Sequence, residues 1–534
     1  MRKILFSIYL FSIGVGLFAQ KPKLVVGLVV DQMRQDYIYR YWERFGNDGF
    51  KKIIANGYSF ENCNFDYVPT YTGPGHASIY TGTTPAIHGV IANNWFDKKK
   101  NLSVYCVDDN KYTAVGAKDD GKSPHQMSST TITDQLRIAS QFRSKVIGIS
   151  LKDRGAVLPA GHSGTAYWFD SKSGNFVTSN YYMNDLPKWV QDFNAKKLPL
   201  KYTSATWNTL HPIATYTASF ADDNNYEDSI GKIAKPVFPY NLDQIRQKME
   251  LKLLNYLPAG NTILVDLGKD AILNEKLGQG AETDFLSLSF SATDYAGHTF
   301  GPQAIEIEDM YLRLDKDLAD FMNFLDKTIG KDNWSLFISS DHGANDVVPY
   351  LNDHKIPAGL IEGEKVAQMV KSALFKQYGD SLLLNLSNEQ LFLDLAKIES
   401  LKLNLCDVEH VAGRAALDYE GYIKYFTSCS FAQGIFPGFV LEQNLYKGWN
   451  AKRSGEVMLL TAPSWMESSK KGTTHGSSYS YDTRVPLIFY GNGIKKGKSI
   501  DPVSITDIAP TLAHLMKVQY PNGCTGKALN IFRD

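Results

Sequence analysis

Two apolar runs joined by a long amphipathic segment constrain the fold of this chain more than any other feature. Residues 285–293 and 334–340 are short apolar runs with polar flanks, which is typical of buried strands. Between them, residues 303–330 carry apolar side chains at helical spacing. Two strands joined by a crossover helix form a βαβ unit with parallel strands. The sequence therefore predicts an α/β fold with a mostly parallel central sheet flanked by helices.

Further apolar runs extend this prediction along the chain. Residues 24–30, 146–151 and 485–490 are Val- and Ile-rich and have the character of strands buried on both faces. Segments of about 164–236 and 348–448 break the alternation of strands and helices, so we expect two insertions, the first of them a cap over the site. We expect one catalytic domain over residues 21–534 that contains both insertions.

The first 20 residues predict export. Arg2 and Lys3 precede an apolar stretch, and the small residue Ala19 lies near the expected cleavage point. A retained membrane anchor is the alternative, but the apolar run is shorter than a comfortable membrane span. We therefore expect a signal peptide over residues 1–20, a mature protein in the bacterial periplasm, and no membrane attachment after cleavage.

Charge and cysteine content narrow the function classes. Lys+Arg and Asp+Glu both number 56, so net charge gives no argument for a nucleic-acid partner, and we expect a monomer that binds small molecules. The five cysteines are an odd number, so at least one thiol stays unpaired, and their spacing does not fix the pairing. Because none forms a CxxC pair, a thiolate zinc site is disfavoured.

A hydroxyl residue in the stretch 70–78, Thr-Tyr-Thr-Gly-Pro-Gly-His-Ala-Ser, is the candidate nucleophile. The Gly-Pro pair predicts the first turn of a helix directly after Thr72. Free amide groups and the helix dipole favour an anion at such a position. By itself the pattern is much more typical of an ordinary helix N-cap, so the assignment depends on the acids and histidines elsewhere.

Acidic residues and histidines recur where predicted strands end. Asp31 follows the strand 24–30, and the βαβ strands are followed by Asp294 with His298 and by Asp341 with His342. His475 lies in a late Ser/Gly-rich loop. In open α/β sheets, ligands bind at the carboxyl ends of the strands. Imidazole with carboxylate suits zinc better than calcium or magnesium, and the six residues suffice for two ions.

Three further polar residues are candidates for binding an anionic substrate. Lys152 and Arg154 follow the predicted strand 146–151, and residues two apart in an extended segment point the same way. A surface salt bridge is the alternative for this pair. Asn93 lies in a turn-rich segment after the predicted helix, and it could donate to an oxyanion without adding charge, although turn asparagines are commonly structural.

Taken in order, these motifs resemble the alkaline phosphatase superfamily. The strand Asp, the T-G-P-G-H turn, the D-x-x-x-H and D-H-G pairs and the late T-H-G follow one another along nearly all of the mature chain. Thr72 together with Asn93, Lys152 and Arg154 is similar to the secreted phosphate-irrepressible alkaline phosphatases of the PafA type, which are phosphate monoesterases with two zinc ions.

This resemblance implies a role for each candidate. It implies that Asp294, His298 and His475 hold one Zn²⁺, that Asp31, Asp341 and His342 hold the other, that Thr72 is the nucleophile, and that Asn93, Lys152 and Arg154 bind the phosphoryl oxygens. It also implies a phosphothreonine intermediate and release of inorganic phosphate. No third, magnesium, site can be identified, and our hypothesis is that Lys152 occupies that region.

Two rivals remain from the sequence. A phosphodiesterase or nucleotide pyrophosphatase of the same superfamily would share the threonine and both metals but generally lacks the Lys and Arg pair. Alongside monoester hydrolysis, a secondary phosphodiesterase activity is compatible with the sequence. A metal-dependent binding protein on an inactive enzyme fold is the rival from another class. A sulfatase is disfavoured because threonine cannot mature to formylglycine.

Overall fold

A twelve-stranded mixed sheet forms the centre of the described structure. The computed structural model describes residues 21–233, 235–434, 438–467 and 470–533, so the predicted signal peptide lies outside the described residues. Along the sheet the order is β21, β2, β20, β13, β1, β12, β7, β8, β9, β5, β6, with β22 beside β2. The bounds are Gly497–Ser499, Tyr58–Asn64, Arg484–Gly491, Trp334–Ser339, Leu24–Val30, Asp284–Phe290, Val146–Ser150, Thr165–Asp170, Asn175–Ser179, Asp108–Val115, Asp120–Lys122 and, for β22, Val503–Ser504.

The middle of the sheet is parallel, as predicted. Strand β1 pairs in parallel with β12 and with β13, and β12 pairs in parallel with β7. In this register Val30 is level with Phe290, so Asp31 and the residues after β12 emerge at the same edge of the sheet. The strand β20, predicted at 485–490, is antiparallel to β13. The mixed α/β architecture with a large central sheet is confirmed.

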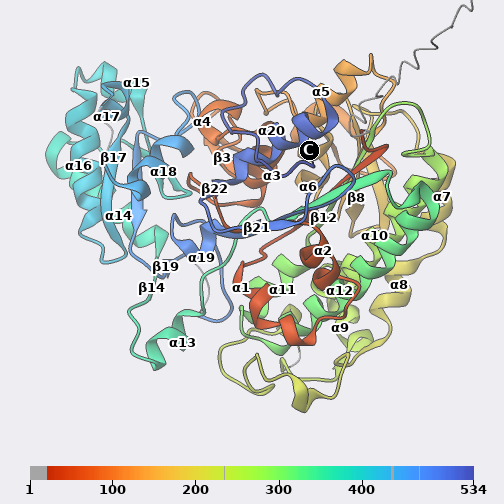
Figure 1. Cartoon of the computed structure of the whole chain (residues 1–534). Coiled ribbons are helices and arrows are strands. Elements are labelled where there is room, and N and C mark those ends of the chain that lie inside the picture. Colours follow the sequence, from red (N-terminus) through yellow and green to blue (C-terminus); the bar gives the residue numbers. More distant parts are fainter. Residues whose placement is uncertain (1–20, 234, 435–437, 468–469, 534) are drawn as a thin grey trace, which may run out of the picture.

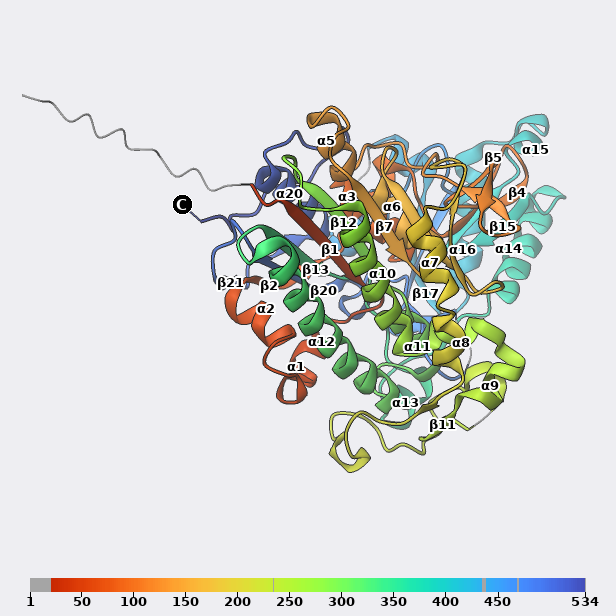
Figure 2. The same cartoon turned by 90° about the vertical axis from the view of Figure 1, so that its right-hand side faces the viewer.

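Helices cover both faces of the sheet (Figures 1 and 2). The predicted helix 303–330 is α12, Ile305–Leu325, and it packs with α10, Ala259–Glu275, over one face. The helices α3 (Thr72–Thr81) and α20 (Ile508–Met516) pack in the core of the other face. Alternate β1 residues therefore enter different cores, Leu28 toward α10 and α12, and Val29 toward α3 and α20.

The segment from about 164 onward first extends the central sheet. Strand β8 pairs in parallel with β7, and β9 returns antiparallel to β8. The later part of the segment contains the helices α7 (Lys188–Ala195) and α8 (Leu198–Thr203). No helix within the described ranges is long and apolar enough to cross a membrane.

The segment from about 348 onward forms a separate lobe, at the left of Figure 1. Its four-stranded sheet has the order β15, β16, β18, β17, with bounds Leu383–Ser387, Gln390–Leu393, Val457–Thr461 and Tyr422–Thr427. Helices α14 (Gly363–Tyr378) and α16 (Leu405–Leu417) share its apolar core. Strand β18 begins after residue 448, where the sequence predicts the end of the insertion, so the lobe extends past the predicted boundary. The sequence of a buried apolar run does not show which sheet the strand will join.

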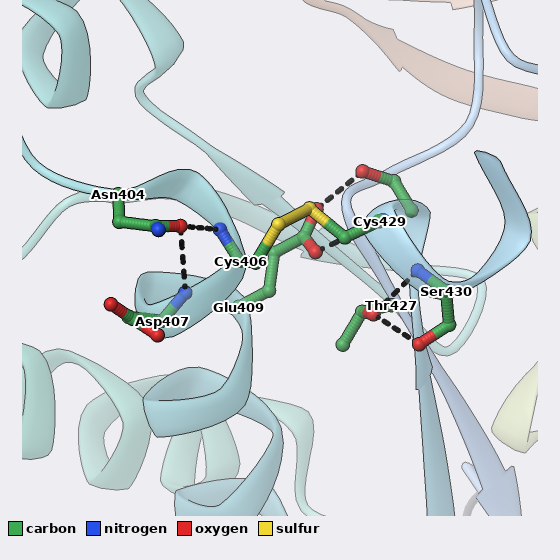
Figure 3. Close-up of a disulfide and its surroundings, with 8 residues drawn as sticks. Asn404, Cys406, Asp407, Glu409, Thr427, Cys429 and Ser430 are labelled. Atoms are coloured by element: carbon green, nitrogen blue, oxygen red, sulfur yellow. Dashed lines mark hydrogen bonds between the residues drawn. A yellow bond between two sulfur atoms is a disulfide. The ribbon is translucent and has the colours of Figure 1, made fainter. Parts of the chain in front are cut away.

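A disulfide fastens this lobe internally. Cys406, in the first turn of α16, is bonded to Cys429, and Figure 3 shows Glu409 beside the bond. Glu409 accepts a hydrogen bond from the Cys429 backbone amide at 3.1 Å, so α16 and α17 (Ser428–Ala432) are also joined by a hydrogen bond at the disulfide. The remaining cysteines, Cys63, Cys106 and Cys524, are free.

Gly148, in strand β7, allows a close contact between this strand and the helix that follows it. A Cβ at this position would lie 2.3 Å from the backbone oxygen of Ala156 in α6 (Asp153–Ala160). We expect Gly148→Ala to displace α6, to lower the free energy of unfolding by about 1–3 kcal/mol, and to reduce activity because Lys152 is the N-cap of this helix and Arg154 lies in its first turn. Gly280→Ala, where the nearest atom is 4.0 Å away, is the control. Equal melting temperatures for both variants would contradict the prediction.

Candidate active site

The structure brings the six predicted metal ligands together in two groups. Their members lie within 4.8 Å of one another in each group, measured between one ligand atom per residue. The first group is Asp294, His298 and His475, and the second is Asp31, Asp341 and His342. Helix α11, Ala292–Phe300, supplies Asp294 and His298 one turn apart. In the second group Asp31 directly follows β1, and Asp341 and His342 are the second and third residues after β13.

The histidines are oriented as metal ligands require. The Nδ1 atoms of His298, His342 and His475 lie 2.8, 3.0 and 2.7 Å from the backbone oxygens of residues 473, 343 and 70. A carbonyl oxygen can only accept, so each Nδ1 carries the proton and donates. The Nε2 lone pair is thereby left for a metal ion, which is the usual arrangement around bound metals.

The second group also contains polar atoms that need a partner. Asp31 Oδ1, Asp341 Oδ2 and His342 Nε2 are buried and make no hydrogen bond. His342 Nε2 lies 3.4 Å from Asp31 Oδ1 and 3.7 Å from Asp341 Oδ2. Burying such atoms without partners is costly. A divalent cation would satisfy all three, so the residues fit the metal ions that the sequence predicts.

Electrostatics point to the same conclusion. Burial, reinforced by Asp294 and Asp341, raises the pKa of Asp31 well above its usual value. Burial likewise raises the pKa of Asp341 to about 6 and lowers the pKa of His342 to about 3. Although burial opposes it, the His298 and Lys152 charges hold the pKa of Asp294 well below its usual value. The site thus concentrates more negative charge than the protein itself balances.

Lys152 lies between the two groups. Its Nζ is 2.7 Å from Asp31 Oδ2, 2.5 Å from Asp294 Oδ2 and 3.4 Å from Thr72 Oγ1. Burial would lower its pKa, but Asp294 and Asp31 outweigh burial and raise it, so the ammonium stays charged. Lys152 therefore faces the site, and the alternative of a surface salt bridge is wrong for this residue.

Thr72 occupies the position predicted for it. It is the first residue of α3, is 1% exposed, and follows the N-cap Tyr71. His76, one turn later, has its Nδ1 2.9 Å from the Thr72 backbone oxygen and its Nε2 2.8 Å from Ser289 Oγ. Burial lowers the pKa of His76 to about 4, so it is a neutral anchor that fixes the first turn of the helix to β12.

Asn93 and Arg154 are each held by a hydrogen bond to a neighbouring residue. Asn93 Oδ1 accepts from the Gly73 amide at 2.7 Å, so its Nδ2 is the group left to donate to a substrate. Arg154 Nη1 donates to Tyr105 Oη at 2.9 Å, and Tyr105 Oη donates to Asp153 Oδ1 at 2.5 Å. The pair Lys152 and Arg154 borders one cavity of about 310 Å³, together with Tyr105.

The sequence analysis missed two residues of this site. The backbone N–H of Gln32 donates to Asp341 Oδ1 at 3.2 Å, and its side-chain Nε2 donates to Asp294 Oδ1 at 2.9 Å. Gln32 therefore links both ligand groups. Its position directly after Asp31, at a strand end, was the available signal. Tyr105 had no such signal because it reaches Arg154 from another strand, β4 (Leu102–Tyr105).

Known proteins similar to this chain carry the same fold and related chemistry. The family model for type I phosphodiesterase / nucleotide pyrophosphatase matches residues 25–483. The chain is 44% identical over 517 residues to a protein named calcium-transporting ATPase from Myroides odoratus (95% of this chain, 94% of that protein). It is 43% identical over 517 residues to alkaline phosphatase PafA from Elizabethkingia meningoseptica, with the same two coverages.

Solved structures agree. The crystal structure of wild-type alkaline phosphatase PafA superposes with a TM-score of 0.92 at 42% identity and covers 96% of this chain and 99% of that chain. A PafA variant with a threonine, an asparagine, a lysine and an arginine substituted matches equally well. This level of sequence identity over nearly the whole of both chains shows family membership as well as a shared fold. The chain therefore belongs to the type I phosphodiesterase / nucleotide pyrophosphatase family and, within it, to the PafA-type alkaline phosphatases, which makes it a phosphoric monoester hydrolase.

Proposed function

We propose that this protein is an exported, two-zinc alkaline phosphatase that hydrolyses phosphate monoesters through a phosphothreonine intermediate. The observation that carries the proposal is the position of Thr72, at a helix N-terminus beside Lys152 and two groups of carboxylate and imidazole ligands. An anion site at a helix N-terminus, a hydroxyl nucleophile and two groups of cation ligands together suit in-line phosphoryl transfer.

Asp294, His298 and His475 would hold one ion, and Asp31, Asp341 and His342 the other. Two zinc ions there would act as Lewis acids on the attacking and leaving oxygens. The Nδ1 hydrogen bonds fix the histidine rings, and Gln32 holds Asp294 and Asp341 in one relative orientation. These contacts mean that the ligands are arranged before any ion arrives.

The reaction would proceed in two displacements at phosphorus. In the first, the Thr72 hydroxyl gives up its proton and its oxygen bonds to phosphorus as the bond to the leaving oxygen breaks, and that oxygen takes up a proton and departs as the alcohol. In the second, a water molecule gives up a proton and its oxygen bonds to phosphorus, the bond to the Thr72 oxygen breaks, that oxygen regains a proton, and inorganic phosphate leaves. Lys152 Nζ, 3.4 Å from Thr72 Oγ1, would stabilise the threonine oxygen as an anion, while Asn93 and Arg154 orient the nonbridging oxygens.

The four substituted residue types of the solved PafA variant support these assignments. Its threonine and asparagine have the same spacing as Thr72 and Asn93, and its lysine and arginine the same spacing as Lys152 and Arg154. For export, the support is the predicted signal at residues 1–20 and the disulfide Cys406–Cys429, which suits an oxidising compartment such as the periplasm.

Removing the nucleophile should abolish turnover. We expect Thr72→Ala to lower kcat/KM for an aryl phosphate monoester by about 10³-fold or more, because no other hydroxyl replaces the attacking oxygen. Thr72→Ser keeps the oxygen and is the matched control. Mass spectrometry of acid-quenched wild-type enzyme should show phosphate on Thr72. Sustained turnover by Thr72→Ala would contradict the mechanism.

The two cations should set the preference for monoesters. A monoester dianion carries one more negative charge than the methyl diester, so we expect Lys152→Ala and Arg154→Ala to lower kcat/KM for the monoester by about 10–100-fold. The loss for the diester should be clearly smaller. Equal losses on both substrates would favour the phosphodiesterase alternative.

Metal analysis should separate two ions from three. Dialysis against a strong chelator should abolish activity, and zinc should restore it with about two ions bound per chain, as the two ligand groups imply. Elemental analysis of the restored enzyme is the measurement. A third tightly bound ion would contradict the hypothesis that Lys152 takes the place of a further metal.

A further inference from the structure

One hairpin turn of the lobe formed by the later insertion contacts two segments of the active site. Strands β15 and β16 pair with Ser387 opposite Gln390, so Asn388 and Glu389 are the two turn residues. Their φ angles are 53° and 56°, as a tight two-residue hairpin of this kind requires. Asparagine is common in such a position, but glutamate is unfavourable there. An unfavourable residue at a turn suggests a role for its side chain.

Both turn side chains contact segments that carry proposed substrate-facing residues. Asn388 Nδ2 donates to the backbone oxygen of Asn94 at 2.8 Å, and Asn94 directly follows Asn93. Tyr71 Oη donates to Glu389 Oε2 at 3.5 Å, and Tyr71 directly precedes Thr72. One turn therefore contacts the chain beside the phosphoryl-binding asparagine and beside the nucleophile.

Tyr71 can transmit this contact because its ring is confined. Its centroid lies 5.4 Å from that of His475, edge to face, and a Cβ on Gly476 would lie 2.7 Å from its ring. A cavity of about 90 Å³ borders Tyr71, Glu389 and His475. Apolar packing supports the same junction, since the ring of Phe96, two residues after Asn94, lies 5.5 Å from that of Phe392 in β16, and the two hydrogen bonds add directional contacts to it.

We propose that Asn388 and Glu389 are positioning residues, through which the lobe sets the placement of Asn93 and Thr72 around the phosphoryl group. This inference rests on the proposed function of Thr72 and Asn93. Neither turn residue touches the reacting atoms. Asn388 acts on phosphate binding through Asn94, and Glu389 acts on the nucleophile through Tyr71.

Glycine substitutions test the proposal sharply because glycine favours positive φ. In the full-length, zinc-loaded enzyme, Asn388→Gly and Glu389→Gly keep the turn and remove only its side chains. Tyr71→Phe removes one hydroxyl and keeps the ring. Lys402→Gly is the matched control, since Lys402 is an exposed residue of the same lobe with a φ of 56°.

We expect two different kinetic signatures. Asn388→Gly should weaken inorganic phosphate binding, measured by calorimetry, and lower kcat/KM for an aryl phosphate by a similar factor of about tenfold. Glu389→Gly and Tyr71→Phe should each lower kcat/KM about tenfold with phosphate affinity unchanged. Because Glu389→Gly and Tyr71→Phe remove the same hydrogen bond, the variant that carries both substitutions should lose no more kcat/KM than either single variant. Melting temperature and zinc content should match Lys402→Gly.

Three outcomes would overturn the proposal: turn variants with the kinetics of Lys402→Gly, multiplying losses in the Tyr71 and Glu389 double variant, or a loss of zinc that accounts for the loss of rate. Failure of the proposed function looks different, because Thr72→Ala would then retain turnover whatever the turn variants do.

Discussion

Three buried carboxylates facing one lysine are the constraint on which the rest of this structure depends. Asp31, Asp294 and Asp341 are each at most 3% exposed, and Lys152 is the ammonium that reaches the first two. Like charges buried this close raise each other's pKa and oppose folding unless cations offset them. The protein thus concentrates buried negative charge at one place, where bound metal ions would offset it and where the proposed phosphoryl chemistry would need them.

The parallel sheet makes this concentration of charge possible. Adjacent strands β1, β12 and β13 end at one edge, so residues that are hundreds of positions apart arrive within contact distance. The strands themselves are fully buried, which fixes the start of each ligand-bearing loop. Rigid strands set the ligand positions, and backbone carbonyl groups set the histidine orientations, so little conformational freedom remains to be lost on metal binding.

Most of the ligand geometry was predictable because it depends on local rules. An acid after a buried strand lies at the functional edge whatever its partners are, and all six predicted ligands meet as expected. Tyr105 and Glu389 follow no such rule, since their importance comes from chain segments that meet only in the tertiary fold. The same reason explains β18: its apolar run specifies a buried strand but not the sheet that receives it. The Cys406–Cys429 pairing was equally inaccessible, because spacing does not fix connectivity.

The contacts of Lys152 and Arg154 separate two kinds of positive charge in the site. Lys152 forms ion pairs with Asp31 and Asp294, so the protein's own carboxylates offset much of its charge. The Arg154 guanidinium donates to Tyr105 Oη, and nearby groups, Tyr105 first among them, keep its pKa raised despite burial. Under the proposed function, metal ions bound by these carboxylates would leave the lysine charge to the substrate, whereas the arginine charge does not depend on them. Charge recognition of a dianion would then be coupled to metal occupancy through Lys152 and independent of it through Arg154.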